Sequence, residues 1–199
     1  MTRMTETETL NRNRDLILAQ ERRFAARVSA RVIDKPKLAI WMILIPVFFV
    51  FYFWQLKRYS DGRKTFAANF VITRQRSLDQ ALAAVGSGEG PDVETVVNAA
   101  DIPDPIRPDY RRWVAVLVDH YRDLLLAHGK SYTALIRDTY KNRTNYLLFL
   151  NRLNQVEREF DAALKPHVAE TTENANGIIK LMEESAIAIR RQIADEIFP

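Results

Sequence analysis

The chain has 199 residues, of which 47% are hydrophobic and 27% are charged, and it contains no cysteine. A chain of this size and composition folds as one domain or at most two. The absence of cysteine excludes a disulfide framework, a thiolate zinc site, an iron–sulfur cluster and a cysteine nucleophile, which leaves three histidines for metal or acid–base chemistry. Because most catalytic chemistry is excluded in this way, the sequence says more about architecture than about function.

The formal net charge of +4 is distributed unevenly along the chain. Residues 1–37 carry nine lysines and arginines against five acidic residues, residues 57–76 carry six against one, and residues 77–199 carry fourteen against nineteen. The large C-terminal part is therefore mildly acidic, which argues against nucleic-acid binding because a nucleic-acid interface needs clustered basic residues. The two basic stretches instead predict contact with anionic lipid head groups.

Residues 1–37 form a basic N-terminal tail with the pattern of an amphipathic helix. The apolar residues near one face of a helix from about residue 8 to 33 are Leu10, Ile17, Phe24 and Val28. Such a helix either lies on lipid or is a solvated helix of weak amphipathic character. The arginines proposed to contact lipid are Arg22, Arg23 and Arg27.

A segment of nineteen residues without any charge, residues 38–56, follows the tail. At about 1.5 Å per residue, a helix of this length is roughly 28 Å long, close to the thickness of the hydrocarbon core of a bilayer. We therefore expect a single transmembrane helix, in preference to a buried core helix or a cleaved signal peptide. The aromatic residues placed as membrane-interface anchors are Trp41, Tyr52 and Trp54.

Charge alone does not orient this segment, since six lysines and arginines lie within twenty residues on each side of it. A short tail with nine positive charges is poorly suited to export, whereas long domains cross a membrane largely regardless of charge. The expected localisation is a single-pass membrane protein with a cytoplasmic N-terminus and the C-terminal domain outside.

Residues 57–85 are predicted to form a juxtamembrane helix, with a possible interruption where Ser77 and Gln80 make a capping box. Residues 86–107 are rich in glycine and proline and are predicted to form a connection with one short helix. The glycines of this connection lack the Lys-Ser/Thr pair of a phosphate-binding loop, so we interpret them as a linker.

Residues 108–199 are predicted to form the core of a helical bundle. A helix from 108 to about 128 precedes a long heptad-patterned helix over 131–165, and a last helix spans about 171–197. Short connections make neighbouring helices antiparallel. The expected fold class is therefore all-α, with a single transmembrane helix followed by an up-and-down antiparallel helical bundle that contains a long heptad-patterned helix.

Three residues mark the ends and breaks of these helices. Gly129 is expected to end the first helix and Ser131 to cap the second. Asn142, a polar residue within the heptad pattern, either sets the register of a paired helix or belongs to a kink or loop over 141–145.

No motif in the chain indicates a metal site or a catalytic centre. No histidine follows a glutamate by three residues or belongs to an H-E-x-x-H pair, so no metal or cofactor is expected. His120 lies on an apolar stripe and is interpreted as a core or interface histidine. The acidic pair Glu157 and Asp161 and the nearby Arg190 are interpreted as charges on solvated helix faces.

The sequence favours a membrane-anchored, non-enzymatic helical protein that acts as a structural, scaffolding or assembly factor through contacts with a protein partner or with itself. The alternative is a single-span sensory or ligand-binding helical bundle that signals to a cytoplasmic partner, and a membrane-tethered enzyme ranks third. An amide-rich ridge on the long helix is the surface best suited to a partner. The residues proposed for partner contact are Asn142, Asn145 and Tyr146, and no catalytic or metal-binding residue is proposed.

Overall fold

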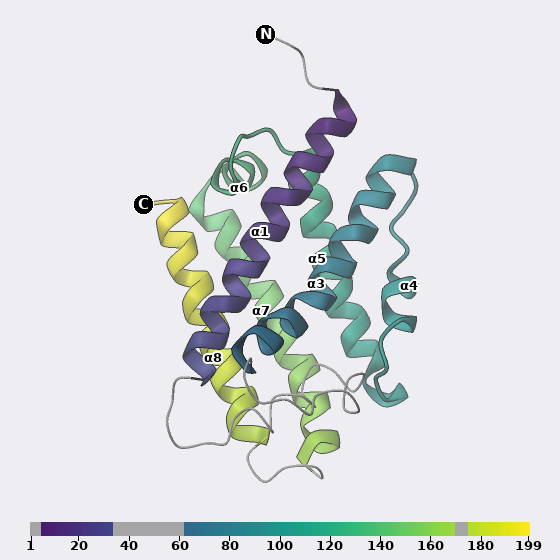
Figure 1. Cartoon of the computed structure of the whole chain (residues 1–199), viewed down its shortest axis with the longest axis vertical. Helices are drawn as coiled ribbons and strands as arrows, with labels where there is room; N and C mark the ends of the chain where they lie inside the picture. Colours follow the sequence, from purple (N-terminus) through teal and green to yellow (C-terminus); the bar gives the residue numbers. More distant parts are fainter. Residues whose placement is uncertain (1–4, 34–61, 170–174) are drawn as a thin grey trace.

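The computed structural model describes residues 5–33, 62–169 and 175–199, and these residues form helices and connecting turns without any β-strand (Figure 1). The all-α class is therefore confirmed for the described part of the chain. Its long helices are α1 (Glu6–Ile33), α3 (Gly62–Ser87), α5 (Arg107–Leu126), α7 (Arg143–Ala169) and α8 (Ala175–Ile197). Its short helices are α4 (Val93–Asn98), the 3₁₀ helix η3 (Asp104–Ile106) and α6 (Tyr132–Tyr140).

The long helices form a ring around one apolar core (Figure 1). α1 and α3 are antiparallel, because Arg14 pairs with Asp79 while Glu21, further along α1, pairs with Arg74, earlier in α3. α7 and α8 are antiparallel neighbours as well. α1 closes the ring by packing against both α3 and α8.

α3 and α5 run in the same direction, which differs from the predicted up-and-down order (Figure 1). The connection that contains α4 and η3 returns the chain to the end of the bundle at which α3 begins. Arg76 fixes this connection to α3 by donating to the Ala99 carbonyl at 3.0 Å, and the Asp92 side chain caps α4. The glycine- and proline-rich stretch thus acts as a crossover between parallel helices.

Residues of α1 are buried as deeply as those of the predicted C-terminal bundle. Ile17 and Val28 have no exposed surface. The Asn13 side-chain amide donates to the carbonyls of Leu125 and Ala127, at 2.9 Å in both cases, and so satisfies backbone acceptors at the end of α5. The described part of the N-terminal tail is therefore a component of the bundle core.

The helix predicted over 131–165 is interrupted between α6 and α7. Lys141 has a φ of 65°, and the Asn142 N–H donates to the Tyr140 carbonyl at 2.8 Å, which is the pattern of a γ-turn. The Asn142 side chain then accepts from the Asn145 N–H at 2.9 Å and caps the start of α7. The break that the sequence left open as an alternative is the arrangement observed.

The cap predicted for the next helix is confirmed, since the Ser131 hydroxyl accepts from the Ala134 N–H at 3.2 Å at the start of α6. Gly129 is needed there because a Cβ at this position would lie 2.7 Å from the Cβ of Ala134.

The possible interruption at Ser77 does not occur. Its hydroxyl donates to the Thr73 carbonyl at 2.8 Å within a continuous α3.

The predicted single-pass localisation is contradicted. No helix in the described ranges is long and apolar enough to cross a membrane. α1 also shares one core with α3, α5 and α8, so the N-terminal helix and the C-terminal bundle cannot lie on opposite sides of a bilayer. The segment 38–56, with the expected anchors Trp41, Tyr52 and Trp54, lies outside the described residues.

Candidate functional site

Four charged side chains from four helices meet inside the bundle. Arg74 of α3 is only 2% exposed and Arg190 of α8 only 6% exposed. Their partners are Glu21 of α1 and Glu157 of α7, both largely buried. A charge removed from water in this way costs several kcal/mol unless it is paired and hydrogen-bonded, so this cluster constrains how the four helices pack.

Arg74 lies at the centre of the cluster and bridges both carboxylates. Its Nε is 3.1 Å from Glu21 Oε2, and its Nη2 is 2.6 Å from Glu157 Oε1. Its guanidinium also lies 4.3 Å from the ring centroid of Phe70 and 5.5 Å from that of Trp113, within the range of cation–π attraction. Ion pairs and aromatic faces together therefore hold this buried cation.

Arg190 completes the cluster from α8. Its two terminal nitrogens bind Glu157 at 2.5 and 2.8 Å in a bidentate arrangement, and Nη1 also donates to Asn154 Oδ1 at 2.5 Å. Burial alone would raise the pKa of Glu157, but the charges of Arg190 and Arg74 outweigh it and lower that pKa below its usual value. Glu157 is therefore the ionised partner that both guanidiniums share.

Glu21 has a different electrostatic balance from Glu157. Burial raises the pKa of Glu21 above its usual value, and the opposing charges of Arg74 and Arg190 do not offset this. The Tyr121 hydroxyl lies close enough to lower that pKa somewhat, although it has no hydrogen-bond partner of regular geometry among the described residues. Because its pKa is raised while that of Glu157 is lowered, Glu21 takes up a proton more readily than Glu157.

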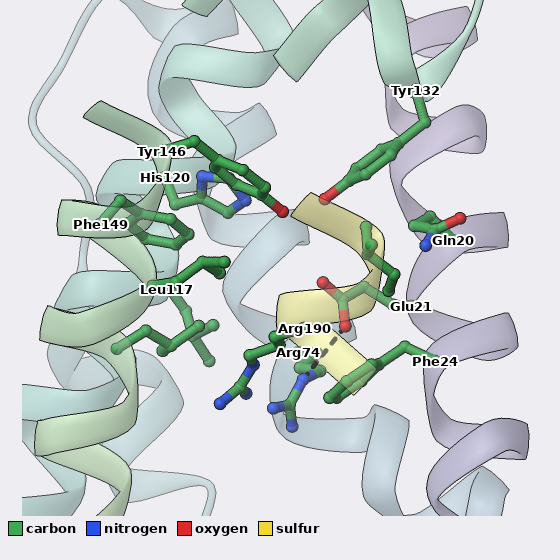
Figure 2. Close-up of a pocket in the computed structure, with 13 residues that line it drawn as sticks. Gln20, Glu21, Phe24, Arg74, Leu117, His120, Tyr132, Tyr146, Phe149 and Arg190 are labelled. Carbon is green, nitrogen blue, oxygen red and sulfur yellow. Dashed lines mark ion pairs between the residues drawn. The ribbon is translucent and has the colours of Figure 1, made fainter. Parts of the chain in front are cut away.

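A cavity of about 40 Å³ lies beside the cluster, and Figure 2 shows the side chains that line it. One water needs at least about 10–15 Å³ measured in this way, so the space corresponds to roughly three waters. Side chains from α1, α3, α5, α6, α7 and α8 contribute to its wall. Its titratable lining residues are Glu21, Arg74, His120, Tyr132, Tyr146 and Arg190.

His120 is held on the cavity wall by an aromatic cluster. Its Nδ1 is 2.6 Å from the Tyr140 hydroxyl, and its ring stacks on Phe149 with centroids 4.1 Å apart. Burial, reinforced by the charge of Arg190, lowers the pKa of His120 to about 3. The ring is therefore neutral near pH 7, and it lies in the core as the sequence predicted, with Tyr140 as its partner.

Two tyrosine hydroxyls face each other across the upper part of the cavity (Figure 2). The Tyr132 hydroxyl lies close enough to Tyr146 to lower the pKa of Tyr146 somewhat. Burial raises the pKa of Tyr146 to about 12, so its hydroxyl keeps its proton at neutral pH. The wall at this point therefore presents neutral hydrogen-bonding groups next to two fixed cations.

A second, smaller cavity of about 20 Å³ lies on the other side of Glu157. Asp161, one turn further along α7, lines it and is 7% exposed. Burial, together with the negative charges of Glu157 and Glu183, raises the pKa of Asp161 to about 8. Within the described residues, no cluster of three or more histidine and acidic side chains is arranged to hold a metal ion.

The residues proposed for partner contact are divided between the surface and the core. Asn142 and Asn145 are exposed at the start of α7, where the Asn145 side chain donates to the Tyr140 carbonyl at 3.0 Å. Tyr146 is 3% exposed and lines the cavity. Surface contact through the two asparagines stays a prediction, while the position of Tyr146 gives it a role inside the bundle.

The arginines proposed for lipid contact lie on the outer side of α1. Arg22 and Arg23 are exposed, and Arg27 is partly exposed, with its Nη2 4.0 Å from Glu196 Oε1 of α8. Lipid contact through these side chains stays a prediction.

The interpretation of Glu157, Asp161 and Arg190 as solvated charges is wrong, since all three are largely buried. The sequence does contain a signal for such burial, because the charged residues interrupt apolar stripes. Arg74, for example, lies four residues from both Phe70 and Leu78, which are buried on the same face of α3. A charged residue within an apolar stripe is therefore a candidate for a buried ion pair.

Asp161 generates a prediction for the pH dependence of stability. It is protonated in the folded state up to about pH 8 but ionised in the unfolded chain above its usual pKa of 3.8, so the folded state binds more protons between these values. Stability should therefore fall as pH rises toward 8, at no more than about 1.4 kcal/mol per pH unit. Asp161→Asn should remove this decline between pH 6.5 and 8.5 in urea unfolding.

Asp195→Asn, a change at an exposed residue of α8, is the control and should keep the slope of the unchanged chain. Parallel pH profiles for Asp161→Asn and the unchanged chain would show that Asp161 ionises normally in the fold.

Comparison with known proteins assigns no family to the chain. No family model matches it, and neither does any curated protein or solved structure. The cavity and its buried charges are therefore the basis on which a function is assigned.

Proposed function

We propose that this protein is a non-enzymatic, ligand-binding helical bundle that holds a small polar solute in its central cavity. The supporting observation is that side chains of six helices, including the buried guanidiniums of Arg74 and Arg190, surround one small space lined by polar and apolar groups. A solute in that space would contact elements from both ends of the chain. Its binding would therefore stabilise the packed bundle by mass action.

The chemistry of the wall favours binding over catalysis. A histidine whose pKa is lowered to about 3, as for His120, is a weak general base at neutral pH. Glu21, the carboxylate in the wall, is paired with Arg74, and Glu157, which lies outside this wall, is occupied by two guanidiniums. The polar groups of the wall are therefore suited to orienting a bound solute.

The volume limits the size of the ligand. A space of about 40 Å³ holds roughly three waters, so a solute of three or four non-hydrogen atoms fits without repacking of the helices. Acetate, acetamide and acetamidinium each have four non-hydrogen atoms and a similar planar shape. They differ in charge, so together they probe the cavity without an assumption about the sign of the ligand.

At least one of these three solutes should raise the thermal unfolding midpoint of the full chain in a concentration-dependent manner. At a concentration one hundred times its Kd, a bound solute contributes about 2.7 kcal/mol, which corresponds to a shift of several degrees for a chain of this size. Leu150→Phe fills part of the cavity and should abolish the shift.

Leu117→Phe, on α5, is a second blocking variant in case the first does not fold. The proposal is contradicted if none of the three solutes changes the midpoint, or if the blocked variants respond as strongly as the unchanged chain.

A second candidate function is a scaffold that acts through protein contacts on the outer face of α7. Leu148, a large apolar side chain on this helix, is 63% exposed. Exposed polar side chains surround it, namely Asn145, Asn151, Arg152 and Gln155. An apolar centre with an amide-rich rim is typical of a protein contact.

If this face mediates self-association, the chain should form a dimer or larger species in sedimentation equilibrium, and Leu148→Asp should weaken that association at least tenfold. Leu126→Asp changes the other strongly exposed leucine, at the end of α5, and should leave association unchanged. A chain that stays monomeric at every concentration tested would remove self-association from the candidate functions.

A further inference from the structure

We infer that the central cavity selects a small planar anion, and that Glu21 takes up a proton when the anion binds. This inference rests on the proposed ligand-binding function and adds the chemical class of the ligand. The charge of the wall, the hydrogen-bond donors on it and the surroundings of Glu21 support the inference.

Two guanidiniums and one carboxylate line the cavity directly. Arg74 and Arg190 both line it, whereas Glu21 is the one carboxylate among its described lining residues. Glu157, which balances the two guanidiniums, lies in the wall of the second cavity instead. A solute in the central space therefore contacts two guanidiniums and one carboxylate directly, while Glu157 neutralises part of the guanidinium charge from outside the wall. These direct contacts favour an anion.

The neutral groups on the wall are rich in hydrogen-bond donors. In the tautomer of His120 whose Nδ1 accepts from Tyr140, the ring proton lies on Nε2, on a ring that lines the cavity. Tyr132 and Tyr146 direct their hydroxyls toward the same space (Figure 2). A planar oxyanion accepts several hydrogen bonds at once, so carboxylate and nitrate match this wall.

Glu21 faces charged and titratable groups from every helix packed around it. They are Arg74 from α3, Tyr121 from α5, Tyr132 from α6, Tyr146 and Glu157 from α7, and Arg190 from α8. Of these, Glu157 is negative, and burial already raises the pKa of Glu21. An anion placed beside the Glu21 carboxylate adds a second like charge and favours the protonated form further. The protonated carboxyl group then becomes an additional donor to the bound anion.

The test is isothermal titration calorimetry of the full chain with sodium acetate and with sodium nitrate between pH 6.5 and 8.5. Titrations in two buffers of different ionisation enthalpy count the protons taken up on binding. We expect uptake of about one proton per anion, so that the apparent association constant rises by up to about tenfold for each unit of pH decrease. The two anions distinguish a carboxylate ligand from an inorganic oxyanion.

Glu21→Gln mimics the protonated state and should bind acetate more tightly than the unchanged chain at pH 8, with no dependence on pH. Glu6→Gln, at an exposed position of the same helix, is the matched control and should behave like the unchanged chain. If Glu21→Gln is unstable, the proton count on Asp161→Asn decides the question, because this variant lacks the other buried carboxyl group that titrates in this range and should still take up about one proton per anion.

The possible outcomes separate the inference from the function on which it rests. Binding of acetate or nitrate without proton uptake would overturn the role of Glu21. Binding of acetamidinium or acetamide, with no binding of either anion, would overturn the ligand class while leaving a ligand-binding bundle. Failure of all four solutes to bind would overturn both.

Discussion

The buried positive charge of Arg74 is the constraint on which the rest of the structure depends. Its guanidinium is removed from water in the middle of the bundle, where it needs Glu21 from one helix and Glu157 from another. Glu157 in turn binds Arg190, so four helices have to pack in one particular arrangement for every charge to be paired. The apolar core supplies most of the driving force for folding, while this network selects which helices are neighbours.

The same network accounts for the cavity. Guanidinium and carboxylate groups meet in fixed geometries and do not fill space as completely as aliphatic side chains. A small space therefore remains between Arg190 and the facing hydroxyls of Tyr132 and Tyr146. Six helices border this space, so a bound solute is linked directly to the stability of the whole bundle. The proposed ligand-binding function therefore follows from the network, whereas the exposed face around Leu148 provides a separate surface for protein contacts.

The helical class and several caps could be predicted because they depend on local sequence. The Ser131 cap and the helix before Gly129 need only a few neighbouring residues, and the apolar spacing indicates helix in every region described. The place of α1 in the core could not be found in this way, because Glu21 meets Arg74 only after the helices have packed. The candidate site could be predicted only in part. A charged residue within an apolar stripe marks itself as a candidate for burial, but its partner on another helix, such as Glu157 for Arg190, is known only once the helices have packed.

The central claim is that Glu157 is the shared partner of two buried cations, and the free energy of unfolding of Glu157→Gln tests it most directly. Removal of this one charge leaves two guanidiniums without their common partner, so stability in urea unfolding should fall by about 3–5 kcal/mol. Glu159 lies on the same helix as Glu157 and forms a more exposed ion pair with Arg112 of α5. Glu159→Gln should therefore cost less than about 1 kcal/mol. Equal effects of the two substitutions would contradict the claim.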